Sequence, residues 1–334
     1  MHIPDGFVNL PVAAVTGVVS AGALGYSLKK AGKELGEQSV PLLGVTAAFV
    51  FAAQMLNFPV AAGTSGHFLG ALMACVLLGP WAGFLVITAV LILQALLMAD
   101  GGITALGANV FNMAVSGGWL GYAVFAWLRR LLGRSSTGFL AAVAIASWLA
   151  VVLASASCAL QLWMSGTAPL QLTLPAMVSV HMIIGVGEAL IGTAVLAVVL
   201  RARPDLIRSL PPALRRPTLV PEAAGGAPGS ARWAQTRKVG VFALVALVVA
   251  LALVIFVAPF ASTSPDGLEK VAEDHGFADT AAEEPLWRFS PLPDYTVPAM
   301  GEGIWSTAIA GLLGVLVLSG LVLALGRVLS RASR

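Results

Sequence analysis

Residues 38–99 of this 334-residue chain read QSVPLLGVTAAFVFAAQMLNFPVAAGTSGHFLGALMACVLLGPWAGFLVITAVLILQALLMA and contain no Asp, Glu, Lys or Arg. A helix of this length would extend over roughly 93 Å, because an α-helix rises about 1.5 Å per residue. The hydrocarbon core of a bilayer is about 30 Å thick, so the stretch is long enough for about three crossings. It predicts an integral membrane protein built from helices.

The composition of the whole chain excludes a soluble globular protein. Apolar residues make up 58% of the sequence and charged residues only 10%, against about 25% charged residues in soluble domains. The net charge of +3 does not indicate a nucleic acid partner, because the basic residues form short clusters between apolar runs and follow no single amphipathic face. We therefore expect contact with a lipid bilayer and no nucleic acid.

Cutting the chain at charged residues and at Gly and Pro breaks gives nine apolar spans. The predicted fold is an all-α integral membrane protein with a seven-span core and a two-span C-terminal module. The predicted spans are 8–28, 40–56, 66–79, 81–99, 103–128, 138–163, 175–200, 239–259 and 304–326.

The basic residues predict the orientation of these spans. With the N-terminus outside, the inner connections hold 17 of the 19 Lys and Arg residues, and only Lys270 and Arg288 lie outside. Basic residues concentrate on the cytoplasmic side of membrane proteins. The sequence therefore predicts an N-out, C-in topology.

Residues 201–238 differ from their surroundings because they are rich in Pro, Gly, Ala and Arg. This segment is too rich in proline for a continuous helix and too polar to span a membrane, so it predicts a cytoplasmic linker. The linker divides the chain into a seven-span unit, residues 1–200, and a two-span module, residues 239–334. The two spans of the module flank an acidic outer loop, residues 260–303.

Two of the four histidines, His2 and His67, fall on the outer side in this topology. As the second residue, His2 places the Met1 α-amine, its own amide nitrogen and its ring Nδ1 in series, so that five- and six-membered chelate rings can close on one ion. His67 can supply a fourth nitrogen. Such a plane favours Ni(II) or Cu(II), allows Co(II) and disfavours tetrahedral Zn(II). The open alternative is a frayed terminal His2 and an interfacial His67.

The predicted span 66–79 is short, and the Gly- and Pro-containing residues before it indicate irregular backbone at membrane depth. Such backbone is tolerated only where it lines a cavity or is buried in protein. Polar side chains in this region and beyond could hydrogen-bond the histidine rings or could satisfy backbone at broken helices. These candidates are Asn57, Thr64, Ser65, Asn109 and Asn112.

His181 and Glu188 lie seven residues apart on the predicted span 175–200, hence on one helical face. Ionisable side chains inside a membrane often mark function. Two interpretations remain open: a supporting or transfer role for His181 with a proton or partner-contact role for Glu188, or a buried polar pair that fixes helix packing.

Two further features have open interpretations. Small residues on the first span recur every four positions and allow a helix of this chain or of a partner to approach closely. These residues are Ala13, Gly17, Ala21 and Gly25. His275, in the acidic loop, could capture metal from outside or remain a solvated loop residue.

The sequence lacks the motifs of common catalytic sites. It contains no G-x-x-x-x-G-K-[ST], HExxH or GxSxG segment. We therefore expect no enzymatic activity and no resident cofactor, and any ATP hydrolysis must come from partner subunits.

Several segments resemble a known family. MHIPDG at residues 1–6, the segment from Asn57-Phe58-Pro59 to Gly63-Thr64-Ser65-Gly66-His67-Phe68, GGITALGAN at 101–109 and HMIIGVGE at 181–188 are similar to the CbiM/NikM substrate-binding membrane component of energy-coupling-factor nickel and cobalt transporters. SPDGLE at 264–269 resembles the signature of the small two-span accessory subunit of nickel uptake systems, fused here in a NikMN-like arrangement.

The resemblance implies an ion bound in a square plane by the Met1 amine, the His2 amide and ring, and the His67 ring. It also implies a transmembrane T-component and cytoplasmic ATPases as partners, in a prokaryotic cytoplasmic (inner) membrane, with Ni(II) or Co(II) as cargo. Two other functions stay open. One is a proton-coupled permease that works alone through His181 and Glu188, and the other is a metal sensor or scaffold that transports nothing.

Overall fold

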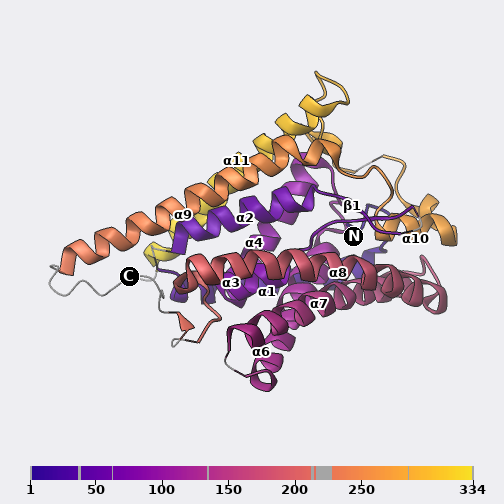
Figure 1. Cartoon of the computed structure of the whole chain (residues 1–334). Coiled ribbons are helices and arrows are strands. Elements are labelled where there is room, and N and C mark those ends of the chain that lie inside the picture. Colours follow the sequence, from indigo (N-terminus) through magenta and orange to yellow (C-terminus); the bar gives the residue numbers. More distant parts are fainter. Residues whose placement is uncertain are drawn as a thin grey trace.

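The computed structural model is mostly helical (Figure 1) and describes residues 2–36, 39–61, 63–133, 135–211, 214–215, 228–284 and 286–332. Its α-helices are α1 (Leu10–Glu34), α2 (Val40–Gln54), α3 (Ala71–Leu78), α4 (Pro80–Leu93), α5 (Leu106–Val110), α6 (Gly121–Leu131), α7 (Ser136–Met164), α8 (Leu170–Ala202), α9 (Pro228–Phe256), α10 (Gly267–His275) and α11 (Ile304–Ala332). The π-helical segments are η2 (Gln94–Met98) and η3 (Phe111–Leu120). One short antiparallel pair joins β1 (Phe58–Pro59) to β2 (Ser65–Gly66).

Among the described residues, six helical segments are long and apolar enough to cross a membrane. These segments are Leu10–Glu34, Pro80–Met98, Ser136–Met164, Leu170–Ala202, Val239–Phe260 and Ile304–Arg331. The other three predicted spans contain shorter helices: α2, the eight-residue α3 at the end of the predicted span 66–79, and the unbroken run of α5, η3 and α6. The chain is therefore a multi-pass membrane protein, as its uncharged stretch predicts.

Helices α2, α3 and α4 form the buried centre. Every residue of α3 is buried. Gly79 adopts φ +87°, which allows Pro80 to begin α4 directly after α3. A Cβ on Gly83 would lie 2.6 Å from the Cα of Cys75, so the backbones of α3 and α4 are in contact. This rigid pair fixes the position of the residues that precede α3.

Helix α1 turns small and polar residues inward and large apolar residues outward, as lipid-facing helices do. Val18 is 73% exposed, whereas Thr16 and Ser20 are buried. Gly17 touches α5, since a Cβ on Gly107 would lie 2.4 Å from the Gly17 Cα.

The stripe of small residues on α1 therefore divides into two halves. Ala13 and Gly17 are half-buried against this chain's own core, whereas Ala21 and Gly25 are exposed. The first half packs internally, and the second half remains available to a neighbouring helix.

The C-terminal helices α9 and α11 pack along α2 (Figure 1). The contact is close at Gly44, where a Cβ would lie 2.6 Å from the Cγ of Leu323, and at Gly314, where it would lie 2.3 Å from the Cζ of Phe51. The connection between α9 and α11 carries α10 across the end of the molecule at which β1 lies (Figure 1). Two packed helices thus hold the outer loop over the core.

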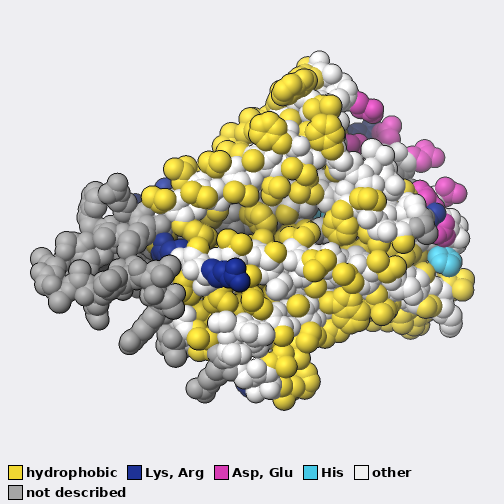
Figure 2. Space-filling model, in the orientation of Figure 1, with side chains coloured by type: hydrophobic (Ala, Val, Ile, Leu, Met, Phe, Trp, Pro, Cys, Tyr) yellow, Lys and Arg dark blue, Asp and Glu magenta, His cyan; other side chains and the backbone are white. Residues whose placement is uncertain are grey.

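The surface is polarised along the helices. Figure 2 shows acidic side chains gathered at the end that carries α10, basic side chains toward the opposite end, and a mainly apolar surface between them. This distribution suits a body that lies across a bilayer.

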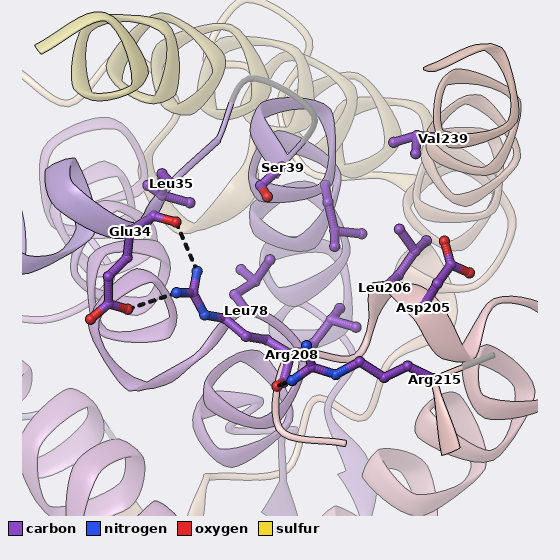
Figure 3. A pocket seen from close by; sticks show the side chains of 11 residues that line it. Glu34, Leu35, Ser39, Leu78, Asp205, Leu206, Arg208, Arg215 and Val239 are labelled. Atoms are coloured by element: carbon purple, nitrogen blue, oxygen red, sulfur yellow. Dashed lines mark hydrogen bonds and ion pairs between the residues drawn. The ribbon is translucent and has the colours of Figure 1, made fainter. Parts of the chain in front are cut away.

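A cavity of about 490 Å³ lies among the C-terminal ends of α1 and α3 and the start of α2 (Figure 3). Arg208 crosses this cavity and donates hydrogen bonds to the Glu34 carboxylate at 2.9 Å and to the Glu34 carbonyl at 3.2 Å. Arg215 also lines it. The carboxylates of Glu34 and Asp205 line the same cavity, and Arg208 already pairs with Glu34 at 2.9 Å, so its charged groups tie chain segments together.

Candidate metal centre

The N-terminal arm, residues 2–5, is fixed to the core by hydrogen bonds. Ile3 is fully buried, and the Asn109 side chain accepts from its N–H at 2.8 Å and donates to its carbonyl at 3.1 Å. Gly101 and Gly102 form a cradle for the arm: a Cβ on Gly102 would lie 2.3 Å from the Asp5 nitrogen, and one on Gly101 would lie 3.3 Å from the His2 Cβ. Glycine is therefore required for this close approach.

Asp5 fastens the arm on both sides. Its Oδ1 accepts from the Thr104 N–H at 2.9 Å and hydroxyl at 2.6 Å. Its Oδ2 accepts from the Leu286 N–H at 3.2 Å, and its carbonyl accepts from the Ala282 N–H at 2.8 Å. Core and outer loop together thus fix the position of His2.

His2 and His67 lie together although they are 65 positions apart in the sequence. Their rings stack with centroids 5.1 Å apart and planes 13° from parallel. Their side chains are 8% and 9% exposed. His67 follows β2, and its Nδ1 lies 3.3 Å from the Phe68 carbonyl oxygen. Donation from Nδ1 to this oxygen leaves a lone pair on Nε2, the form in which histidine binds metals.

Asp100 holds His2 from the other side. Its Oδ1 lies 3.1 Å from the His2 Nδ1, and it also accepts a hydrogen bond from the Tyr295 hydroxyl. Although burial opposes ionisation, the His2 imidazole and the Tyr295 hydroxyl lower the pKa of Asp100 below its usual range. Burial and the Asp100 charge raise the pKa of Tyr295. Asp100 is therefore an ionised carboxylate beside the histidine pair.

The SPDGLE segment closes the site through its backbone and side chains. The Pro265 carbonyl accepts from the Ser65 N–H at 2.9 Å. Asp266 caps α10 by accepting at Oδ1 from the Leu268 N–H at 2.7 Å and the Glu269 N–H at 3.0 Å, while Glu269 accepts from the Asp266 N–H at 2.8 Å. The other carboxylate oxygen of Asp266 lies 4.0 Å from the His67 Nε2.

The five polar candidates occupy different places. The Asn109 side chain forms hydrogen bonds with the backbone of Ile3, and the Ser65 hydroxyl donates to the Ser264 carbonyl at 2.8 Å. The carbonyl of Asn57 accepts from the Ser262 N–H, and the backbone of Thr64 bonds within its own turn.

Asn112 belongs to a separate network with α7. Its Oδ1 accepts from the Ser157 hydroxyl at 2.6 Å and from the Gln161 amide at 2.7 Å. Its hydrogen bonds therefore join η3 to α7.

Glu188 stabilises the start of α3. Its carboxylate accepts from the Leu69 N–H at 2.6 Å and from the Gly70 N–H at 2.9 Å, and Gln54 donates to the Leu69 carbonyl at 2.9 Å. These bonds satisfy backbone groups that the irregular chain before α3 leaves unpaired. They favour the interpretation of Glu188 as a packing residue.

Replacing Glu188 with Gln is expected to lower the free energy of unfolding by about 1–3 kcal/mol, because an amide can accept from only one of the two buried N–H groups in this geometry. Thermal unfolding in detergent measures the change, with Glu273→Gln on the exposed face of α10 as the matched control. An unchanged midpoint together with lost uptake would instead favour a proton relay.

His181 is buried and directs its Nδ1 at the Met177 carbonyl, 2.7 Å away. Its ring packs against Gly267 of α10, where a Cβ would lie 2.7 Å from its Cε1.

His275, by contrast, is exposed at the end of α10. Within the described residues, no three His, Cys, Asp or Glu side chains are grouped closely enough to hold an ion. Met1, the expected source of the amine, lies outside those residues.

Asp100, Asp266 and Tyr295 border the site without having been singled out individually from the sequence. Asp100 carried a signal, because it is the carboxylate that ends the long uncharged stretch. Asp266 belongs to the SPDGLE signature, but the motif gives no indication that its carboxylate lies near His67. No sequence pattern indicates that Tyr295 lies at the site, since its hydrogen bond to Asp100 joins positions 195 residues apart.

Residues 2–206 match the family model described as the cobalt uptake substrate-specific transmembrane region, CbiM. The chain belongs to the CbiM family. Its residues 240–331 match the PDGLE domain, so a PDGLE domain follows the CbiM region in one polypeptide.

Relatives and a solved structure agree with this membership. The CbiM-family chain is 36% identical over 336 residues to the "Putative fused nickel transport protein NikMN" of Archaeoglobus fulgidus, across 100% of this chain and 99% of that one. It is 30% identical to the fused nickel transport protein NikMN of Rhodobacter capsulatus, across 99% of both chains. A crystal structure described as a truncated transition metal transporter aligns with 60% of this chain and 98% of its own, with a TM-score of 0.55 and 33% identity.

The CbiM-family chain is thus a nickel or cobalt transport component of the CbiM/NikM type fused to a PDGLE domain. The relatives are transport proteins and not enzymes, in agreement with the missing catalytic motifs.

Proposed function

We propose that this chain is the substrate-capture component of an ATP-driven energy-coupling-factor importer whose cargo is Ni(II), with Co(II) as the alternative. The observation that carries the proposal is the buried stack of His2 on His67 beside a fixed N-terminal arm. Imidazole nitrogens suit both ions. The nickel names of the two full-length relatives favour Ni(II).

The proposed coordination is a plane of four nitrogens: the Met1 amine, the His2 amide and Nδ1, and the His67 Nε2. Since the His2 Nδ1 lies 3.1 Å from Asp100, binding through this atom requires the ring to turn about its Cβ–Cγ bond and release that contact. Asp100 then remains nearby as a negative charge that offsets the charge of the ion.

Energy for transport comes in this proposal from partner subunits, a transmembrane T-component and cytoplasmic ATPases, because the chain has no phosphate-binding loop. The chain crosses a prokaryotic cytoplasmic (inner) membrane nine times, with its N-terminus outside. The acidic end at α10 and the basic opposite end support this orientation (Figure 2).

The two rival functions have weaker support. A permease that relays protons through His181 and Glu188 needs an exchangeable carboxyl, whereas Glu188 is occupied by the amides of Leu69 and Gly70. A sensor or scaffold would bind the ion and move none.

Competitive uptake tests the proposal. Cells that express the chain with all partners should take up radiolabelled nickel, and a matched strain whose ATPase lacks its phosphate-loop lysine should take up at least about tenfold less. Excess unlabelled Ni(II) should suppress uptake more strongly than equal Co(II). Uptake by the chain alone in vesicles, driven by a pH gradient, would overturn the proposal in favour of the permease.

A further inference from the structure

A second, small cavity lies under the first turn of α10, next to the histidine pair. It has a volume of about 20 Å³, and its polar lining consists of His67, His181 and Asp266, with Val151 and Ile184 among its apolar walls. This volume admits about one particle the size of a water molecule. We call it the transit cavity.

Both histidines that line the transit cavity have the same hydrogen-bonding arrangement. The Nδ1 of His181 lies 2.7 Å from the Met177 carbonyl oxygen, and the Nδ1 of His67 lies 3.3 Å from that of Phe68. Donation from Nδ1 to a carbonyl leaves the lone pair on Nε2. Metal-binding histidines are commonly oriented in this way.

Gly267 brings Asp266 next to His181. A Cβ at Gly267 would lie 3.1 Å from the His181 Nε2, so α10 can pack this closely on the ring only with glycine there. Asp266 uses Oδ1 to cap α10, whereas its Oδ2 lies on the side of His67, 4.0 Å from Nε2. The cavity thus combines imidazole nitrogen with an anionic oxygen, donors that divalent transition metals accept.

We propose that His181 and Asp266 form a transient loading position through which a divalent transition metal ion passes on its way to His67 and the N-terminal nitrogens. The inference rests on the function proposed above and adds a second position to it. The described residues hold no ready three-ligand cluster, and this suits transit, because a passing ion must bind weakly enough to leave.

A transient position changes rates without changing affinity. It lowers the barrier between solution and the final site equally in both directions, so its removal slows association and dissociation by the same factor. A residue that binds the ion in the final site behaves differently, because its loss weakens the equilibrium affinity and speeds dissociation.

The experiment uses the purified full chain and Ni(II) alone, with association and dissociation followed by stopped-flow absorbance. His181→Asn keeps a donor for the Met177 carbonyl and removes Nε2. Asp266→Asn keeps a good N-cap and removes the charge. His275→Asn and Asp279→Asn change the same residue types at exposed positions of the same loop and serve as matched controls.

His181→Asn should slow association at least tenfold and dissociation by the same factor, with Kd within twofold of the wild type. Asp266→Asn should also slow association at least tenfold, but its dissociation should slow less, because the charge that it removes lies 4.0 Å from the His67 Nε2 and attracts the bound ion. The controls should keep wild-type rates. A preserved Kd also shows that the variant has folded, and Asp266→Ser, another capping residue, repeats the test if Asn disturbs α10.

Wild-type rates in both variants would overturn the loading position. A Kd of His181→Asn weakened tenfold or more with faster dissociation would also overturn it, by making His181 a ligand of the final site. A wild-type chain that binds neither Ni(II) nor Co(II) would overturn the proposed function and this inference with it, so the two failures are distinguishable.

Discussion

Replacing His67 with Ala should weaken Ni(II) binding at least about 100-fold, more than the loss of a group that only supports a ligand. The substitution removes a nitrogen that the proposed plane cannot replace, because the other donors all come from the first two residues. His2→Ala should weaken binding further, since it removes the nitrogen that closes one chelate ring. Calorimetry with the purified chain measures both effects.

The fold should survive both substitutions. The arm stays fastened through Ile3 and Asp5, whose hydrogen bonds do not involve either imidazole. Thermal midpoints close to that of the wild type would verify this, and His275→Ala is the matched control on an exposed histidine. Wild-type affinity in either the His2 or the His67 variant would show that the proposed plane is wrong.

Blocking the amino terminus should abolish binding and uptake. A folded tag fused ahead of Met1 converts its amine to an amide, and only the free amine, with a pKa of about 8, gives up its proton readily to a competing metal. The tag would also have to fit beside a His2 side chain that is 8% exposed. The measurements are nickel binding by the purified chain and uptake with all partners present.

The same tag after Arg334 is the control, and it should leave binding and uptake unchanged. A single residue added ahead of Met1 is a poor control, because a histidine at the third position forms a complete chelate without His67. Mass spectrometry must show that the N-terminal fusion is intact. An intact fusion that transports at the wild-type rate would exclude the terminal amine as a ligand.

Local pattern was sufficient for the apolar helices and for part of the site, but not for α10, which lies within the predicted outer loop. The uncharged stretch and the spacing of breaks placed helices in all nine predicted spans, and the Gly and Pro residues before His67 predicted the irregular chain found at β1 and β2. The pairing of His2 with His67 followed from the expected topology, because both fall on the outer side.

Long-range partners could not be predicted in the same way. Asn112 carries no local sign that its amide binds Gln161, and Glu188 carries none that it binds the amides before α3. Such pairs depend on how helices pack, which periodicity alone does not specify. The same holds for Asp266, whose motif was visible but whose position over His67 depends on the packing of α9 and α11 against α2.

The outer loop is attached at both of its ends to helices of the same polypeptide as the core, and this fusion determines how the loop meets the site. Because α9 and α11 belong to the same polypeptide as the core, engagement of Asp266 with the site is an intramolecular event with a high effective concentration, on the order of millimolar for short tethers. A separate subunit must reach the site by association within the membrane, at a rate that depends on its abundance. In the fused chain every core carries its own loop in a fixed one-to-one ratio, whatever the level of expression.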